Sequence, residues 1–310
     1  MALLLTALTA CSVGDDTPEP GGRALSVVAT TTQVGSVAAE IGGDAIDLVT
    51  LLQPGVETHD FELTPAAGAA LEAADLILVS GAGLEDWLDD TIETLGHADR
   101  VRDMSVGIEL RMGGDEDHDD EDGHDEDGHE EGVDPHYWLT ADNAVVMVAN
   151  VRAALVEALP GSDDALTERA DALIARLEAA DNEIHALIGE VPQESRKIVT
   201  DHDALGYFIE AYGLELVGSV FPSLDVSAEP SAQEIEALVA DIREHGVTAI
   251  FTESAVDPRL ARVIADETDA RLVQEPLYTD SLGAAGSDAD TLDGMLLHNA
   301  RVIRDGLLGG

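Results

Sequence analysis

The sequence predicts an α/β fold: two similar lobes with central, mainly parallel sheets flanked by helices, joined by one long rigid helix. Short apolar runs alternate with amphipathic segments over residues 25–106, and the same order returns over residues 197–276. Alternation of this kind with short loops is typical of parallel sheets covered by helices. Between the two series lies a helical run, 162–189, which at 1.5 Å per residue would be about 40 Å long and could span two lobes.

In the first lobe, short apolar runs predict strands, and helical spacing between capping signals predicts helices. Gly42 and Gly43 end the first helix, and Thr64-Pro65 is a good start for the second. The predicted strands are 25–30, 45–52, 76–80 and 101–106, and the predicted helices are 32–41, 65–74 and 84–95.

The second half begins with helical segments and then returns to the alternating order. Pro160-Gly161 separates a helix over 141–159 from the long run, which has apolar residues every three or four positions. The predicted strands that follow are 197–200, 214–221, 248–251 and 271–276, and the predicted helices are 204–212, 231–245 and 258–268.

Length and composition suggest two domains of ordinary size, since 310 residues with 45% hydrophobic content can bury a substantial core. We expect residues 1–23 to be a signal remnant and flexible tether, 24–161 the N-terminal lobe, 162–190 the linking helix and 191–310 the C-terminal lobe. Within the first lobe, residues 115–131 are only Asp, Glu, His and Gly, so we expect a disordered loop there.

The net charge of −49 argues against nucleic acid as a partner, because phosphate would be repelled. The loop 115–131 holds only twelve of the 64 acidic residues. The excess is therefore spread over the chain, and salt adaptation or solubility is its expected cause. We expect a monomer.

Cys11 is the single cysteine, which excludes an intrachain disulfide and a cysteine-based metal site. The apolar run 1–10 is far shorter than the roughly 20 residues of a spanning helix. Leu8-Thr9-Ala10-Cys11 resembles the lipobox of bacterial lipoprotein signal peptides, although no Lys or Arg precedes the run. We expect a lipid anchor at Cys11 on the outer face of the cell membrane, or a periplasmic location; a cysteine without a role is the alternative.

Four metal-competent side chains follow predicted strands or lie at a lobe's end, where ligands of parallel sheets bind. They are His59, His136, His202 and Asp280. Three imidazoles and one carboxylate form a four-coordinate set suited to Zn(II), with Mn(II) as the second candidate. Acidic neighbours could orient the histidines, and Glu253 is a reserve ligand or orienting residue; these neighbours are Asp60, Asp134, Asp201 and Asp203.

The acidic loop carries His118, His124 and His129 just before His136, which suggests auxiliary metal capture beside the main site. An acidic surface loop without a metal role is the alternative.

Four segments in order, V56-ETHDFELT-P65, D134-PHYW-L139, H202-DALGY-F208 and Y278-TDS-L282, resemble the motifs of the zinc/manganese substrate-binding proteins of bacterial ABC transporters, a ZnuA/TroA-like family of lipoproteins. The resemblance runs from about Leu25 to the C-terminus. It implies two lobes around a rigid helix, a metal ion held between them by His59, His136, His202 and Asp280, and delivery to a permease. Zinc-specific members often carry a His- and acid-rich loop, and manganese members tend to have Glu in place of His202.

The favoured function is therefore capture of Zn(II) outside the cytoplasm and its delivery to an ABC importer permease with its ATPase. A zinc hydrolase with Glu57 or Glu253 as general base is the alternative, disfavoured because four protein ligands close the coordination sphere. A metal buffer or surface adhesin using the same site stays open.

Overall fold

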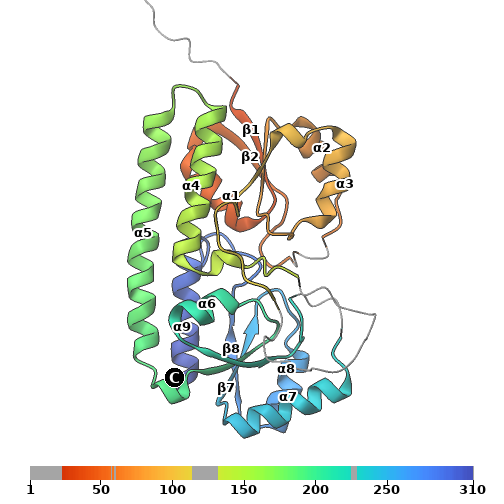
Figure 1. The fold of residues 1–310 in the computed structure, drawn as a ribbon, viewed down its shortest axis with the longest axis vertical. Helices are drawn as coiled ribbons and strands as arrows, with labels where there is room; N and C mark the ends of the chain where they lie inside the picture. Colours follow the sequence, from red (N-terminus) through yellow and green to blue (C-terminus); the bar gives the residue numbers. More distant parts are fainter. Residues whose placement is uncertain (1–22, 57, 59–60, 114–131, 225–228, 310) are drawn as a thin grey trace, which may run out of the picture.

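The computed structural model describes residues 23–56, 58, 61–113, 132–224 and 229–309, and these form two α/β halves stacked along one axis (Figure 1). Each half contains a four-stranded parallel sheet, in the order β2-β1-β3-β4 in one and β6-β5-β7-β8 in the other. The predicted fold class is therefore confirmed, and the two sheets repeat the same strand order.

The first sheet and its helices closely follow the predicted pattern. Thr64 caps α2 by accepting the Ala67 N–H at 3.1 Å, and Pro65 is the first helical residue. The elements are β1 (Leu25–Ala29), α1 (Thr32–Gly42), β2 (Ile46–Thr50), α2 (Pro65–Ala73), β3 (Leu76–Val79), α3 (Asp86–Leu95) and β4 (Val101–Asp103).

Strand β4 ends three residues earlier than predicted. The side chain of Asp103 accepts hydrogen bonds from Ser105 N and Oγ, both at 2.7 Å, and this turns the backbone away from the sheet. Gly107 with φ 85° completes the turn. The apolar residues that suggested a longer strand, among them Val106, therefore lie in a turn.

The remaining elements are α4 of the first half, α5 between the halves, and the strands and helices of the second half. Ser231 and Glu234 form a reciprocal capping box at the start of α7. The elements are α4 (Ala141–Ala158), α5 (Asp163–Gly189), β5 (Lys197–Thr200), α6 (Gly206–Tyr212), β6 (Glu215–Ser219), α7 (Ala232–His245), β7 (Ala249–Glu253), α8 (Arg259–Glu267), β8 (Arg271–Leu277) and α9 (Leu292–Leu308).

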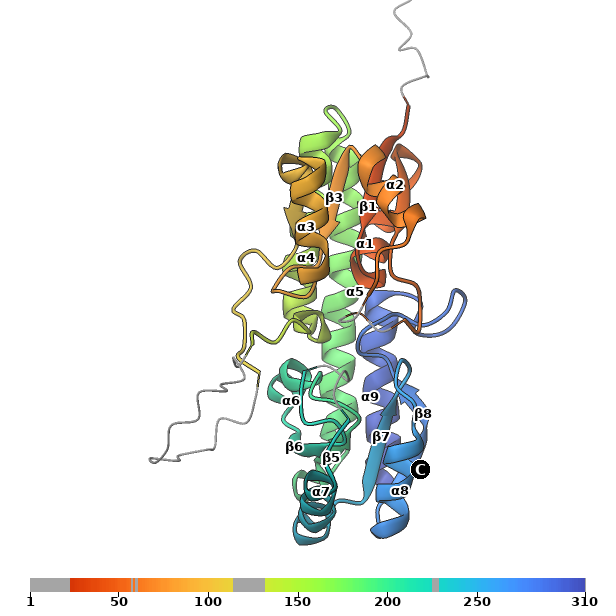
Figure 2. The ribbon, with the colours of Figure 1, turned by 90° about the vertical axis from the view of Figure 1, so that its right-hand side faces the viewer.

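Helix α5 runs beside both halves and packs against α1 and α4 of the first and α6 and α9 of the second (Figures 1 and 2). Its inward stripe is the one that the apolar spacing predicts, and every member is buried: Leu166, Ala170, Leu173, Leu177, Ala180, Ile184 and Leu187. All of these residues except Ala180 join one apolar core that includes side chains from both halves. Within the described residues, no helix combines the length and apolar character needed to cross a membrane.

The last helix, α9, received no bounds from the sequence. Its N-terminus is capped by Thr291, which accepts the Gly294 N–H at 3.2 Å, and one face of it is buried against α5. It completes the core on the side of the second sheet.

Candidate metal centre

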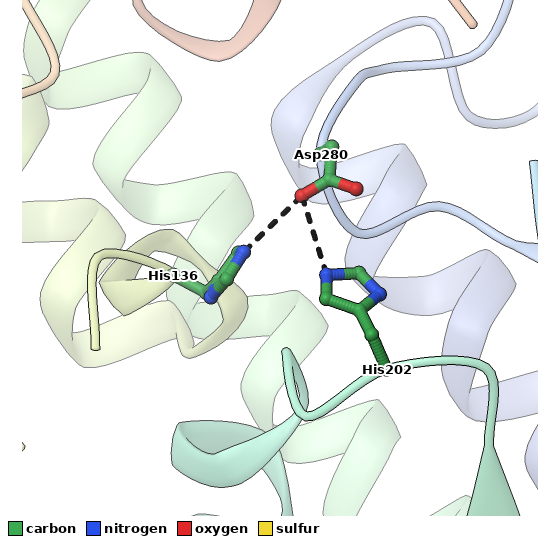
Figure 3. Close-up of side chains that lie close together, drawn as sticks. All are labelled: His136, His202 and Asp280. Carbon is green, nitrogen blue, oxygen red and sulfur yellow. Dashed lines mark hydrogen bonds and ion pairs between the residues drawn. The ribbon is translucent and has the colours of Figure 1, made fainter. Parts of the chain in front are cut away.

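Three of the four predicted ligands converge between the two halves (Figure 3). His202 lies on the loop after β5, Asp280 on the loop after β8, and His136 just before α4. One potential ligand atom from each lies within 4.8 Å of the others, and all three residues are buried. Among the described residues, this group has the composition and spacing to hold a metal ion.

The carboxylate of Asp280 stands between the two imidazoles. Its Oδ1 lies 3.2 Å from Nε2 of His136 and 3.7 Å from Nε2 of His202. The two rings are 5.4 Å apart between centroids and meet edge to face. Figure 3 shows the three side chains pointing toward one another from separate segments of the chain.

His136 is fixed through its other ring nitrogen. Oδ1 of the buried Asp134 accepts the backbone N–H of His136 at 2.9 Å and also lies 2.9 Å from its Nδ1. Bonding of Nδ1–H to a carboxylate leaves the Nε2 lone pair for a metal ion. The two aromatics that follow are buried, and the hydroxyl of Tyr137 donates to Ser80 O at 2.7 Å. The imidazole of His136 therefore lies at the edge of the buried core.

His202 has the same arrangement with a different carboxylate. Nδ1 of His202 lies 2.8 Å from Oε2 of Glu253, and Oε1 of Glu253 accepts the His202 N–H at 3.0 Å. Asp201 holds Glu253 in turn, since its Oδ2 accepts the Glu253 N–H at 2.8 Å. Glu253 lies behind the imidazole, so its geometry is that of an orienting residue.

The segment carrying Asp280 is held by residues of the first half. The indole N–H of Trp138 donates to Thr279 O at 2.8 Å, and the Leu282 N–H donates to Thr32 Oγ1 at 2.8 Å. The Gly55 N–H donates to Ser281 Oγ at 2.9 Å. Asp280 thus follows a strand of one sheet, and contacts with the other half also position it.

Burial and charge act in opposite directions on the three side chains. Burial alone would lower the pKa of His136, but hydrogen bonds and charges from Asp134 and Asp280 outweigh it and raise the pKa to about 9. Burial also opposes the outcome at His202, whose pKa Glu253 and Asp280 nevertheless raise well above its usual value. For Asp280, burial is outweighed by the two histidines, which hold its pKa well below the usual range. Protons therefore compete with a cation for this site.

Burial raises the pKa of Asp201 to about 7, with the nearby charge of Glu253 adding to the shift. Oδ1 of Asp201 is buried and has no hydrogen-bond partner among the described residues.

Several predicted residues lie outside the part of the chain that the structure describes. They are Cys11, Glu57, His59, Asp60, His118, His124 and His129. A fourth ligand and an auxiliary loop site therefore remain predictions.

Two residues beside the site were not singled out from the sequence. Arg111 pairs with Asp134, Nη1 to Oδ2 at 3.1 Å, and the Tyr207 hydroxyl donates to Asp134 O at 3.0 Å. Tyr207 belongs to a motif already noted for His202. Arg111 could have drawn attention as one of only 15 basic residues, placed at the edge of the acidic loop.

The chain is similar to known metal-binding proteins over nearly its whole length. The manganese-binding lipoprotein MntA of Halalkalibacterium halodurans is 29% identical over 96% of this chain and 93% of its own length. The metal ABC transporter substrate-binding lipoprotein ScbA of Streptococcus cristatus is 27% identical over 99% of this chain and 96% of its own. Among solved structures, the periplasmic zinc binding protein TroA from Treponema pallidum superposes with a TM-score of 0.82 and 28% identity, covering 92% of this chain and 99% of that one.

The family model described as zinc-uptake complex component A, periplasmic, matches residues 27–306, nearly the whole chain. The resemblance noted from four short motifs is thereby confirmed. The chain belongs to this family, whose members are metal-binding substrate-binding proteins of ABC transporters and not enzymes.

Proposed function

We propose that this protein binds Zn(II) between its two halves through His59, His136, His202 and Asp280 and delivers it to the permease of an ABC importer, which works with its ATPase. The buried convergence of His136, His202 and Asp280 is the observation that carries the proposal. The proposal includes a division into two lobes, 24–161 and 191–310, with the linking helix 162–190 between them.

The choice of zinc rests on the donor set. Imidazole nitrogen suits Zn(II) better than the harder Mn(II), which favours carboxylate and water oxygen. Two buried imidazoles and one carboxylate are in place, and His59 would complete a closed tetrahedral set. Relatives are named for either metal, manganese for MntA and zinc for TroA, so the metal has to be measured.

The deciding experiment titrates the metal-free protein with Zn(II) and with Mn(II), each against a competing chelator, in the wild type and in His202→Ala. We expect tighter binding of Zn(II) than of Mn(II) in the wild type and a loss of at least tenfold for Zn(II) in the variant. His298→Ala is the matched control. This histidine lies on α9, is half-buried, and places its Nε2 3.0 Å from Pro276 O on β8, away from the metal centre. Equal loss in both variants, or tighter binding of Mn(II), would contradict the proposal.

Two further parts of the proposal concern residues near the N-terminus and in the acidic loop. A lipid on Cys11 would hold the protein at the outer face of the cell membrane, which fits relatives named as lipoproteins. The loop histidines, His118, His124 and His129, would collect metal beside the main site. Deletion of residues 115–131 should then lower the number of zinc ions bound while leaving the tight affinity unchanged.

A further inference from the structure

Arg111 connects the two halves directly beside the metal centre. It lies in the segment after β4, and its side chain reaches α6, the helix that follows His202. Nη1 lies 3.1 Å from Oδ2 of Asp134, and Nε lies 3.4 Å from Oε2 of Glu210. The guanidinium carbon lies 5.5 Å from the ring centroid of Tyr207.

The backbone of Arg111 is held by Asp134 and Tyr207 as well. The Arg111 N–H donates to the Tyr207 hydroxyl at 2.9 Å, and that hydroxyl donates to Asp134 O at 3.0 Å. The Asp134 N–H donates to Arg111 O at 2.9 Å. Arg111, Asp134 and Tyr207 therefore form a closed ring of hydrogen bonds that joins the first half to α6.

The two oxygens of Asp134 have separate partners. Oδ2 faces Arg111, while Oδ1 faces the backbone N–H and Nδ1 of His136. Nη1 of the planar guanidinium contacts Oδ2 while Nε lies toward Glu210, so the group fixes Oδ2 from one side. The orientation of the Asp134 carboxylate, and through it the orientation of His136, thus depends on the position of the guanidinium group.

Gly206, the first residue of α6, leaves the space that the guanidinium occupies. A Cβ atom at this position would lie only 1.5 Å from Nη1 of Arg111. A side chain there would push the arginine away from Asp134. The close approach of Arg111 to α6 therefore requires both the arginine and the glycine at position 206.

The pair with Asp134 carries more weight than the pair with Glu210. The side chain of Asp134 is 1% exposed and that of Glu210 is 76% exposed. An exposed ion pair contributes little, whereas a buried carboxylate that loses its partner is left without compensation.

We propose that Arg111 is a positioning residue for metal binding: it holds Asp134 so that His136 presents Nε2 to the ion, and it ties this orientation to the helix behind His202. The proposal rests on the proposed function, since it assigns Arg111 a role at that same site. Arg111 does not contact the ion itself.

The test measures Zn(II) affinity by chelator competition and the visible spectrum of the Co(II)-loaded full chain, which reports the geometry of the ligands. Loss of residues that orient a metal-bound histidine typically costs 10–100-fold in affinity. Arg111→Ala should weaken Zn(II) binding by at least tenfold and change the Co(II) spectrum, and Arg111→Lys should recover only part of both. Arg102→Ala is the matched control: its side chain is equally exposed at 35% and pairs with Glu157 at 3.1 Å.

A double-mutant cycle shows whether Arg111 acts through Asp134. If it does, Arg111→Ala combined with Asp134→Asn should weaken binding by much less than the product of the two single losses. Multiplicative losses would overturn the proposal, as would an Arg111→Ala protein with unchanged affinity and an unchanged Co(II) spectrum.

Folding and binding controls keep the result interpretable. If Arg111→Ala does not fold, Arg111→Lys and Tyr207→Phe decide by the same two measurements, because each keeps most of the packing and alters one link of the hydrogen-bonded ring. A wild-type chain that binds neither Zn(II) nor Co(II) would refute the proposed function itself. Normal wild-type binding with no effect in these variants would refute only the role of Arg111.

Discussion

Two buried glutamates at corresponding edges of the two sheets have very different partners. Glu253 ends β7, and Glu85 lies just beyond β3; each of these strands is third in its sheet. Glu85 accepts hydrogen bonds from Thr30 Oγ1 at 2.5 Å, Ser80 N at 2.6 Å and Gly81 N at 2.9 Å, so its carboxylate closes a loop. Glu253 instead turns toward a histidine of the metal centre.

The comparison shows that a perturbed pKa alone does not identify a functional residue. Burial raises the pKa of Glu85 to about 7, against the hydrogen bonds from Thr30, Gly81 and Ser80 that lower it. Such shifts are common at active sites, but structural networks produce them too. Both carboxylates accept from backbone and hydroxyl groups, but only Glu253 also contacts an imidazole among the described residues, and this partner separates the two roles.

The largest expected effect is the loss of Zn(II) affinity when a ligand of the metal centre itself is removed. Asp280→Ala removes the carboxylate between the two imidazoles and should weaken Zn(II) binding by more than about 100-fold, or about 2.8 kcal/mol. Competition titration of the metal-free protein measures this loss. Retention of tight binding in this variant would remove Asp280 from the ligand set.

Glu253→Gln tests the functional side of the comparison. It keeps the volume of the side chain but replaces a carboxylate oxygen beside His202 Nδ1, so Zn(II) affinity should fall by about 10–100-fold. Thermal unfolding of the metal-free variant, followed by circular dichroism, checks that the fold is retained. An affinity equal to the wild type would show that Glu253 has no orienting role.

The pH dependence of binding follows from the protonated histidines. Because the pKa of His136 is about 9 in the metal-free protein, zinc must displace a proton below that pH. The affinity for Zn(II) should fall by at least about tenfold when the pH is lowered from 8 to 7. Titrations in matched buffers measure this slope, and a flat profile would contradict it.

The same raised pKa has a consequence for the metal-free fold. The pKa of His136 in the folded state, about 9, lies above the ordinary value of 6.5 for a histidine side chain. Its contribution to stability is therefore fully present below pH 6.5 and is lost as the pH rises through about 9. Denaturant unfolding of the metal-free protein across this range measures that loss.

Glu85→Gln tests the structural side and should have the smallest effect on binding. The amide group replaces one acceptor oxygen and leaves a buried donor without its partner, which should lower the free energy of unfolding by about 1–3 kcal/mol. Zn(II) affinity should change by less than about threefold. A larger change would mean that the loop after β3 reaches the ion through Tyr137, whose hydroxyl donates to Ser80 O.

Much of this architecture follows from local sequence patterns. Alternating apolar runs predicted both sheets, and the position of ligands after parallel strands predicted the meeting of His202 and Asp280. The rule works because it depends on topology, and topology follows from the order of elements along the chain.

Contacts between distant side chains could not be obtained in the same way. Arg111 and Glu210 are both charged residues in a highly charged chain, and no periodicity distinguishes them from their neighbours. The contact between them comes from the packing of α6 against the segment that carries Arg111, which depends on both halves at once. The shorter β4 has a local cause, the turn at Asp103. The apolar residues that follow gave no sign of this turn in the sequence.

The tethering of the Asp280 loop bears on how quickly a bound ion can leave. This loop follows β8 in the second half, yet Thr32, Gly55 and Trp138 of the first half form hydrogen bonds with it. Swinging the halves apart must therefore break those bonds or drag the aspartate along. We therefore expect dissociation of a bound ion to require local opening of residues 278–282, and hydrogen–deuterium exchange at the Leu282 amide would measure the rate of that opening.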